Sequence, residues 1–353
     1  MTRKEYAGID LFKLIFSFFV IFIHCHPEGT VPFLIANGVG RLAVPFFFVA
    51  AGYFLGKKVL FADKEGRKRA SASFLRRILK MYLIWTVIYL PLTMITFIVG
   101  QGMSLTQSVL EYIRSFFFLG SASQLWYLPA LLVGAALCCL LTKKLRSGWV
   151  FAIGLLFFLV GIFNEAYAGL CPPVLSDFYE LIYNPLFVRT RNGLFFATVF
   201  VAMGFLFAEN PALSEKKRPL LNGALTLLFT IAMCIESYLL NAYGISGDRY
   251  GMYLFALPAA FFCFRFAYGL EMRALGEKRA YLLRKLSTVI YLLHQLVNGV
   301  GVVTVFDTFI GVPLTDTLVG FLLITLITLP LSLLMARAGM KKSKVGAFFA
   351  ALA

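Results

Sequence analysis

The sequence predicts an all-α fold, a polytopic membrane bundle of about ten transmembrane helices with both termini in the cytoplasm. Hydrophobic residues make up 60% and charged residues 14% of the 353 positions, whereas soluble domains have roughly 45–50% and 25%. Long apolar runs recur along the chain, and most Lys and Arg residues lie in alternate connectors between them. The net charge of +16 therefore indicates membrane orientation rather than nucleic acid. We expect a lipid bilayer around the chain and no nucleic-acid partner.

Ten apolar runs are long enough, or nearly so, to cross a hydrocarbon core of about 30 Å. They are expected at residues 9–26, 40–57, 80–99, 124–142, 149–164, 190–208, 220–240, 250–268, 287–306 and 314–336. The first run lacks a small-residue cleavage site, so we interpret it as a retained helix rather than a signal peptide. We expect one transmembrane domain over residues 1–353.

Two connectors differ from the rest. The loop 57–80 concentrates nine cations, and the positive-inside rule places it in the cytoplasm, as expected for the plasma membrane. The long loop 165–189 on the outer side is aromatic and proline-rich. Its composition suits a lid or a re-entrant element better than a solvated loop.

The first run, DLFKLIFSFFVIFIHCH, carries one polar stripe. At 100° per residue, Asp10, Lys13, Ser17 and His24 share a helix face. Eleven residues separate Lys13 from His24, which is roughly 16 Å along the axis at 1.5 Å rise. A histidine inside a bilayer is costly unless it is used, so His24 is a candidate functional residue.

The next two runs carry basic residues with two interpretations each. Arg41 stands at the outer end of the second run, where it is either a snorkelling residue on a packing helix or a substrate contact. Arg76, Arg77 and Lys80 recur at helical spacing where the third run begins. They are either an orientation signal on anionic headgroups or a phosphate-binding face.

Later runs add further polar groups. Trp126 opens the fourth run, typically as an interfacial anchor, and Arg191 with Asn192 opens the sixth. Tyr291 and His294 are three residues apart in the ninth run and share one stripe. A buried structural histidine is the alternative interpretation of His294.

The remaining polar residues predict little chemistry. Glu236 in the seventh run is expected to form a salt bridge with an outer arginine. The six cysteines show no CxxC pairing, so we expect neither a disulfide framework nor a metal site.

Four segments together resemble the acyltransferase-3 family of membrane O-acyltransferases. These segments are GIDLFKLIFSFFVIFIH, RLAVPFFFVAAGYFL, QLWYLPALL and STVIYLLHQ, similar to the opening helix, the second helix, the central Trp motif and the late Tyr and His motif of that family. Within it, GID, AVPFFF and TRNG look most like the membrane portion of the serine racemases of vancomycin resistance. The basic residue of the opening motif is usually Arg, and here it is Lys13.

The resemblance implies an acyl-CoA donor, with acetyl-CoA the simplest case, and a hydroxyl acceptor such as a cell-envelope carbohydrate. His24 would be the general base, with Tyr291 and His294 as further catalytic residues. The donor phosphates would bind Lys13, Arg76, Arg77 and Lys80. The acceptor would contact Asp10, Arg41, Trp126, Arg191 and Asn192.

Two other functions are compatible with the same residues. In the serine racemases the membrane portion is thought to supply L-serine, so a transporter of a small amino acid is the main alternative. The dense basic block at residues 57–80 has no evident use in a transporter. An accessory or sensor subunit is the third possibility, because Lys lacks the bidentate fork of Arg.

Overall fold

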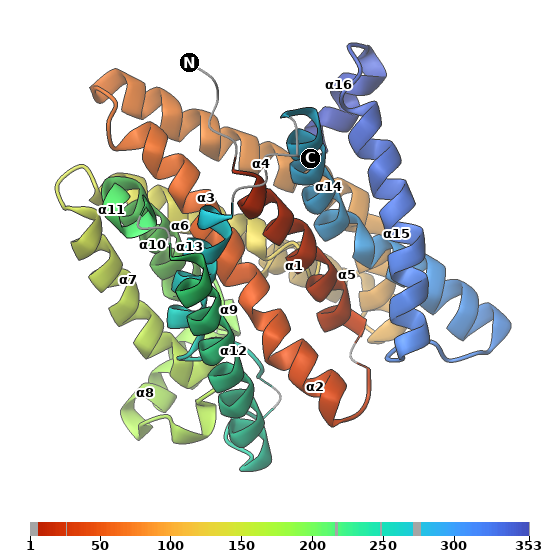
Figure 1. Cartoon of the computed structure of the whole chain (residues 1–353). Coiled ribbons are helices and arrows are strands. Elements are labelled where there is room, and N and C mark those ends of the chain that lie inside the picture. Colours follow the sequence, from red (N-terminus) through yellow and green to blue (C-terminus); the bar gives the residue numbers. More distant parts are fainter. Residues whose placement is uncertain (1–5, 26, 216–217, 248, 271–276, 353) are drawn as a thin grey trace.

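The computed structural model describes residues 6–25, 27–215, 218–247, 249–270 and 277–352, and every regular element within them is helical (Figure 1). This confirms the predicted all-α class for that part of the chain. The longer helices are α1 (Ala7–Cys25), α3 (Ala43–Val59), α4 (Lys64–Ile95), α6 (Tyr127–Leu141), α7 (Ser147–Gly161), α10 (Thr198–Glu209), α12 (Pro219–Ala242), α13 (Ala256–Gly269), α14 (Glu277–Leu296) and α15 (Leu318–Ala338).

Shorter helices and single turns connect or extend these. The shorter helices are α2 (Thr30–Asn37), α5 (Leu105–Arg114), α8 (Pro173–Phe178), α9 (Asn184–Phe187), α11 (Pro211–Glu215) and α16 (Lys344–Ala351). The 3-10 turns are η1 (Val39–Leu42), η4 (Ile162–Asn164) and η5 (Ala168–Leu170). The π-helical segments are η2 (Thr96–Gly100), η3 (Ser115–Leu119), η6 (Tyr179–Tyr183), η7 (Gly193–Ala197) and η8 (Val297–Ile310).

Seven helices in the described residues are long and apolar enough to cross a membrane. They are Ala7–Cys25, Thr30–Val59, Lys64–Gly100, Ser147–Asn164, Pro219–Ala242, Arg279–Ile310 and Leu318–Ala338. The other three predicted runs coincide with shorter apolar helices, namely Tyr127–Leu141, Gly193–Glu209 and Ala256–Gly269. The chain is thus a helical membrane protein, and ten crossings remain a prediction.

The basic loop expected at residues 57–80 is a helix for most of its length. α3 continues to Val59, and α4 begins at Lys64 and runs for 32 residues. Asp63 caps α4, because its side chain accepts a hydrogen bond of 2.8 Å from the Gly66 amide. Lys, Arg and Ala all favour helix, so the basic segment lengthens the third run instead of forming a loop. The prediction of a loop was wrong here.

The outer connector 165–189 is built of short helical pieces, η5, α8, η6 and α9. Tyr179 returns to the bundle, where its hydroxyl donates a hydrogen bond of 2.8 Å to the Val160 carbonyl. The helix α5 was not predicted from the sequence. It opens with a capping box, in which the side chains of Ser104 and Gln107 each bond the other residue's backbone amide.

Close packing of α3 and α10 forms the centre of the bundle. A Cβ atom on Gly52 would lie 2.2 Å from the Val201 carbonyl oxygen, and one on Gly204 would lie 2.3 Å from that of Val49. Only glycine permits this backbone approach. α1 packs against α3, α13, α14 and α15, so its polar stripe faces neighbouring helices.

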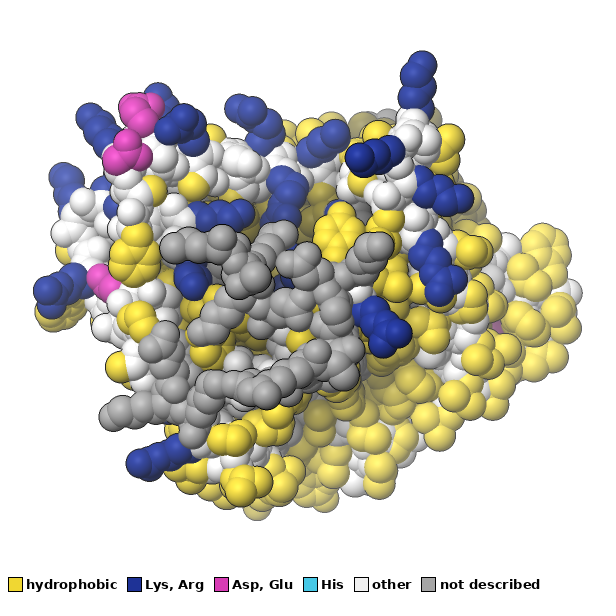
Figure 2. All heavy atoms as spheres, turned by 45° about the horizontal axis from the view of Figure 1, so that its top comes forward, with side chains coloured by type: hydrophobic (Ala, Val, Ile, Leu, Met, Phe, Trp, Pro, Cys, Tyr) yellow, Lys and Arg dark blue, Asp and Glu magenta, His cyan; other side chains and the backbone are white. Residues whose placement is uncertain are grey.

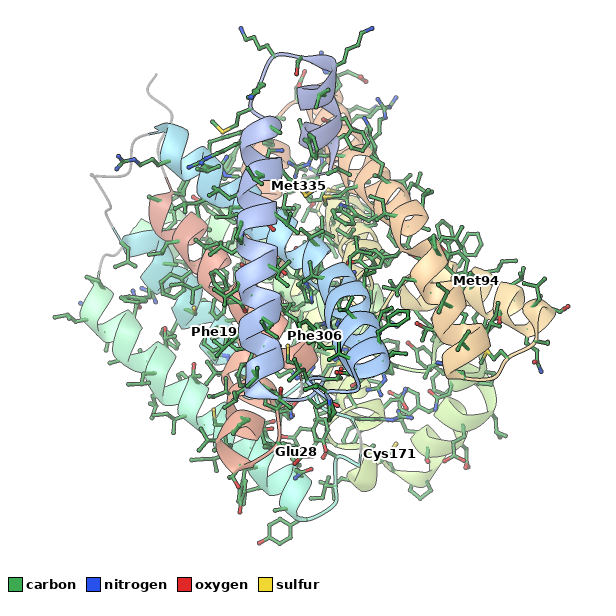
Figure 3. The ribbon with its side chains drawn as sticks, turned by 90° about the vertical axis from the view of Figure 1, so that its right-hand side faces the viewer. Phe19, Glu28, Met94, Cys171, Phe306 and Met335 are labelled. Atoms are coloured by element: carbon green, nitrogen blue, oxygen red, sulfur yellow. The ribbon has the colours of Figure 1, made fainter. Side chains whose placement is uncertain are left out.

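The two ends of the bundle differ in charge. The start of α4 and the whole of α16 lie at the end of the bundle that is uppermost in Figure 1. Figure 2 shows many Lys and Arg side chains gathered over that end, and hydrophobic side chains below them. We call it the basic end. Glu28 and Cys171 lie at the opposite end in Figure 3, with Phe19 and Phe306 between them and Met335. We call that the far end.

Candidate active site

Two histidines that are distant in sequence meet where α1 packs against α14. The ring centroids of His24 and His294 are 5.2 Å apart, with the rings tilted by 39°. His24 is half-buried, whereas His294 is only 1% exposed. Both are the last-turn basic residues of their helices. The sequence interpretation that singled out each histidine separately did not predict that they pair.

The hydrogen bond of His294 indicates its tautomer. Nδ1 lies 3.2 Å from the Ile290 carbonyl oxygen, and a carbonyl only accepts, so we assign the proton to Nδ1. Nε2 of this neutral ring then carries a lone pair, and it has no hydrogen-bond partner in the described part of the chain. A buried acceptor without a partner is unusual and is suited to receive a proton or to orient a donor.

Tyr291 lies beside the histidine pair, with its ring centroid 6.3 Å from that of His294. Its hydroxyl donates a hydrogen bond of 2.6 Å to the Gln124 carbonyl. Aromatic rings of Tyr127 and Phe47 contact it at 5.4 and 6.1 Å. These contacts fix Tyr291 between α14, α3 and α6.

A charged cluster occupies the opposite ends of α1 and α14, toward the basic end. Asp10 is fully buried and receives two hydrogen bonds from Arg284, of 3.2 Å from Nε and 2.9 Å from Nη2. Lys13 interacts electrostatically with Asp10, Arg284 and Arg77. Its ammonium also lies 5.3 Å from the ring centroid of Phe54. Asp10 thus interacts with two cations, Arg284 and Lys13, and Arg77 interacts in turn with both of these.

The α4 residues proposed for phosphate binding line one open pocket of about 400 Å³. Its lining residues, all on α4, are Arg69, Ala72, Ser73, Arg76, Arg77 and Lys80. Arg77 interacts electrostatically with Arg284 and with Tyr127. Tyr127 in turn contacts Tyr291, which lies beside His294.

The arginines on the other side of the histidine pair also come together. Arg191 stacks over Trp126, with 5.0 Å from guanidinium carbon to ring centroid. Arg41 donates hydrogen bonds to Asn37 Oδ1, of 3.3 Å from Nε and 2.7 Å from Nη2, and interacts electrostatically with Arg191. Asn192 caps η7, with its Oδ1 3.0 Å from the Leu194 amide, so it has a structural role here.

The structure therefore groups the predicted residues into three sets. His24, Tyr291 and His294 form one. Lys13, Arg77 and the neighbouring α4 cations form the second, and Arg41, Trp126 and Arg191 form the third. Asp10, predicted with the third set, lies instead in the second, because Arg284 is its partner.

Sequence reasoning missed Arg284, the partner of Asp10. It also missed Glu165 and Arg189, which lie 3.7 Å apart (Oε2 to Nη1) and both interact electrostatically with Arg41. One signal was available for Arg284: it precedes His294 by ten residues, much as Lys13 precedes His24 by eleven. Glu165 and Arg189 lie in the outer connector, where no helical period marks them.

The expected salt bridge of Glu236 is not what the structure shows within the described residues. Its carboxylate accepts from the Tyr167 hydroxyl at 2.5 Å and from the Leu254 and Phe255 amides at 2.6 and 3.0 Å. Three donors satisfy this buried acid without an arginine, because it binds the free amides at the start of α13.

The acyltransferase domain of the acyltransferase-3 family matches residues 6–337. A serine/alanine racemase of Enterococcus gallinarum is 31% identical over 265 residues, which cover 73% of this chain and 36% of that protein. No solved structure matches the chain.

Two amino-acid racemases of Enterococcus faecalis are each 30% identical, over 274 and 325 residues. These matches cover 75% and 90% of this chain, and 36% and 44% of the racemases. The chain thus spans less than half the length of the curated relatives. Because the family model matches residues 6–337, nearly the whole chain, the chain belongs to the acyltransferase-3 family of membrane acyltransferases.

Proposed function

We propose that this protein transfers an acyl group, acetyl in the simplest case, from cytoplasmic acyl-CoA to a hydroxyl of an extracytoplasmic or membrane-linked acceptor. A cell-envelope carbohydrate is one acceptor of this kind. The observation that carries the proposal is the pairing of α1 with α14. It joins the His24–His294 pair, 5.2 Å between centroids, to a cluster of cations around Asp10.

The histidine pair suits proton transfer. In the proposed reaction, His24 takes the proton of the acceptor hydroxyl as its oxygen attacks the thioester carbonyl carbon. The carbon–sulfur bond breaks, an ester forms, and the proton passes to the departing thiolate. General-base catalysis of this kind contributes typically about 10²–10⁴-fold. His294, held by Ile290, would orient the neighbouring imidazole.

The cationic cluster suits the phosphates of the donor. Arg77, Lys13 and Arg284 interact with one another across α4, α1 and α14. Asp10 offsets only part of their charge. Guanidinium and ammonium groups form charge-assisted hydrogen bonds with phosphate oxygens. The donor arm would then follow Tyr127 and Tyr291 toward the histidines.

The test is acyl-CoA turnover by the purified protein in lipid vesicles, measured as thiol release with candidate hydroxyl acceptors on the far side. His24→Ala should lower turnover by at least about 10²-fold and leave CoA affinity nearly intact. Thermal melting and gel filtration of the variant show whether it folds. Phe22→Ala, a truncation of a buried residue in the same helix turn, is the matched control and should retain turnover if it folds.

Transport of a small amino acid is the second candidate, because the relatives described above are named amino-acid racemases. In that function no thioester is consumed. Wild-type protein that accumulates labelled L-serine in vesicles, yet consumes no acyl-CoA with any acceptor, would replace acyl transfer by transport. Full turnover by folded His24→Ala would likewise remove the proposed catalytic role.

A further inference from the structure

A second open pocket, of about 590 Å³, lies where the start of α7 meets the end of α10. The α7 side contributes Arg146, Gly148, Trp149 and Ala152, and the α10 side contributes Glu209 with two neighbours. A Cβ atom on Gly148 would meet no atom within 4 Å, so the pocket has room for a ligand group beside the helix. None of its residues belongs to the three sets of the candidate active site.

Two opposite charges line this pocket without pairing with each other. Oε2 of Glu209 accepts a hydrogen bond of 2.8 Å from the Ser147 amide, which joins the end of α10 to the start of α7. Its Oε1 accepts no hydrogen bond from the residues that the structure describes. The exposed guanidinium of Arg146 likewise forms no ion pair with them. A ligand that carries a negative and a positive group on separate atoms would satisfy both side chains.

Trp149 indicates that the pocket lies at a membrane surface. Its side chain is 67% exposed, and it stands in the first turn of the candidate membrane span Ser147–Asn164. Tryptophan is enriched at the level of the lipid headgroups. In Figure 1, α7 runs from beside α11 toward α8, and the positive-inside rule places the basic connector before it in the cytoplasm. We therefore expect the pocket at the headgroups of the inner leaflet.

An apolar stripe continues from the pocket along α7. Ala152, Leu156 and Leu159 follow Trp149 at spacings of three, four and three residues, which is one face of a helix. The side chains of Leu156 and Leu159 are 62% and 39% exposed. Ten residues rise roughly 15 Å, about half of a hydrocarbon core of about 30 Å, which is the depth of one leaflet. A charged pocket next to such a stripe matches the form of a phospholipid.

We propose that this pocket binds a zwitterionic phospholipid, with its phosphate on Arg146, its ammonium on Glu209 and its acyl chains along the α7 stripe. Guanidinium with phosphate and ammonium with carboxylate both form charge-assisted hydrogen bonds. The indole face of Trp149 also attracts an ammonium group. A purely anionic headgroup would instead bring a second negative charge next to Glu209. This lipid site goes beyond the proposed acyl transfer and does not depend on it.

The experiment uses Trp149 as a reporter in lipid vesicles. Lipids with brominated acyl chains quench the fluorescence of a nearby tryptophan, and the quenching that Trp149→Phe removes belongs to Trp149. Brominated phosphatidylethanolamine competes with unbrominated phosphatidylglycerol at varied mole fractions, and the bromine is then moved to the other lipid. Wild type should favour phosphatidylethanolamine at Trp149 by at least about threefold, the effect expected of an exposed charge pair.

Two substitutions separate the two ends of the headgroup. Glu209→Gln keeps an oxygen for the Ser147 amide but loses the negative charge, so the preference over phosphatidylglycerol should disappear. The phosphate is tested by competition with diacylglycerol, which lacks it. Wild type should favour phosphatidylethanolamine over diacylglycerol by at least about threefold, and Arg146→Gln should remove this preference.

Matched controls neutralise exposed charges elsewhere toward the basic end. Glu65→Gln in the first turn of α4 and Arg337→Gln in the last turn of α15 should retain both lipid preferences. Gel filtration and thermal melting show whether each variant folds. Because the Arg146 side chain is exposed, Arg146→Gln carries the test if Glu209→Gln does not fold.

Equal quenching of Trp149 by the two phospholipids in wild type would overturn the inference. So would a preference for phosphatidylglycerol, the result expected if the exposed Lys143 and Lys144 alone select the lipid. Unchanged preferences in folded Glu209→Gln or Arg146→Gln would also overturn it. Acyl-CoA turnover is measured separately, so a failure of the proposed function leaves these results unaffected.

Discussion

Lys13 is the residue at which this chain departs from the usual basic residue of its family. Its ammonium interacts with Asp10, Arg284 and Arg77 and lies over the Phe54 ring. A lysine presents a point charge, whereas an arginine presents a planar fork that can bind a phosphate through two bonds. The cluster around Lys13 therefore lacks one fork, and the guanidinium of Arg284 is engaged by Asp10 through Nε and Nη2.

We predict that Lys13→Arg preserves or raises acyl-CoA turnover and that Lys13→Ala lowers it by at least about tenfold, the effect of losing roughly 1.4 kcal/mol of transition-state binding. Steady-state kinetics in vesicles measures both variants. Ile15→Ala, which truncates an exposed residue of the same helix, serves as the control. Equal turnover in all three proteins would leave Lys13 as an anchor at the membrane surface.

Helical spacing made several site residues predictable. His24, Tyr291 and His294 stood on polar stripes of otherwise apolar runs, and a polar group in such a run needs a partner. Glu165 and Arg189 offered no such sign, because residues in irregular segments follow no period. Arg191 was predicted from its place at the start of the sixth run and from the TRNG motif, whereas its contact with Trp126 depends on folding.

The element with the clearest proposed role is the first half of α4. Its exposed Arg76 and Arg77 line the open pocket of about 400 Å³, and Arg77 also contacts the Phe74 ring at 5.5 Å. Because both residues are exposed overall, each phosphate contact is expected to be weaker than a buried one.

We predict that Arg76→Ala combined with Arg77→Ala weakens CoA binding by about tenfold, or roughly 1.4 kcal/mol. The weakening should shrink as salt rises, because exposed charges are screened. Titration calorimetry in detergent at low and high salt measures both effects. Lys341→Ala with Lys342→Ala removes the same charge from the loop after α15 and should bind CoA normally. An unchanged affinity of the α4 variant would refute the phosphate-binding face.

The length of α4 was not predictable from the sequence, because the orientation signal and the helix propensity reside in the same basic residues. Its basic residues signal membrane orientation, and the same residues favour helix. Hydropathy placed the start of the run at residue 80, whereas the cap at Asp63 starts the helix at Lys64. Asp63 before a helix-favouring segment is a recognisable N-cap signal. It was not used because the segment that follows is too polar to be counted in a membrane-spanning run.

On the scale of the whole molecule, the sequence predicts that the basic end faces the cytoplasm. The far end then faces outward, and it carries Cys171 (Figure 3). This cysteine is a partly exposed free thiol in the outer connector. Burial, and secondly the charge of Glu180, raise the pKa of the Cys171 thiol, so its thiolate fraction is low near neutral pH.

We predict that a membrane-impermeant maleimide labels Cys171 in intact cells and that labelling accelerates as pH rises from about 7 to 8.5, because more thiolate forms. Cys171→Ser should abolish this labelling. A cysteine introduced in that variant at Ser343, next to α16, should react only after permeabilisation. Labelling of Ser343→Cys in intact cells would reverse the orientation.

The sequence specified the bundle more fully than it specified its pairings. Each of the ten predicted apolar runs coincides with a helix in the described residues, because apolar length is a local property. The contact between α1 and α14 joins segments about 270 residues apart. It arises because two polar stripes satisfy each other within an apolar bundle, and that match is visible only when the chain has folded.

If the proposed acyl transfer holds, the parallel spacing on α1 and α14 has a consequence for the length of donor that the site selects. Asp10 and Arg284 join the two helices near one end, and His24 and His294 meet farther along them. At a rise of 1.5 Å per residue, Lys13 and His24 are roughly 16 Å apart along α1 over eleven residues, and Arg284 and His294 are roughly 15 Å apart along α14 over ten residues. The two helices thus set the distance between the cationic cluster and the histidine pair. A thioester on a shorter arm could reach the imidazoles only by releasing its phosphates, so selection among donors would follow their length rather than their acyl group.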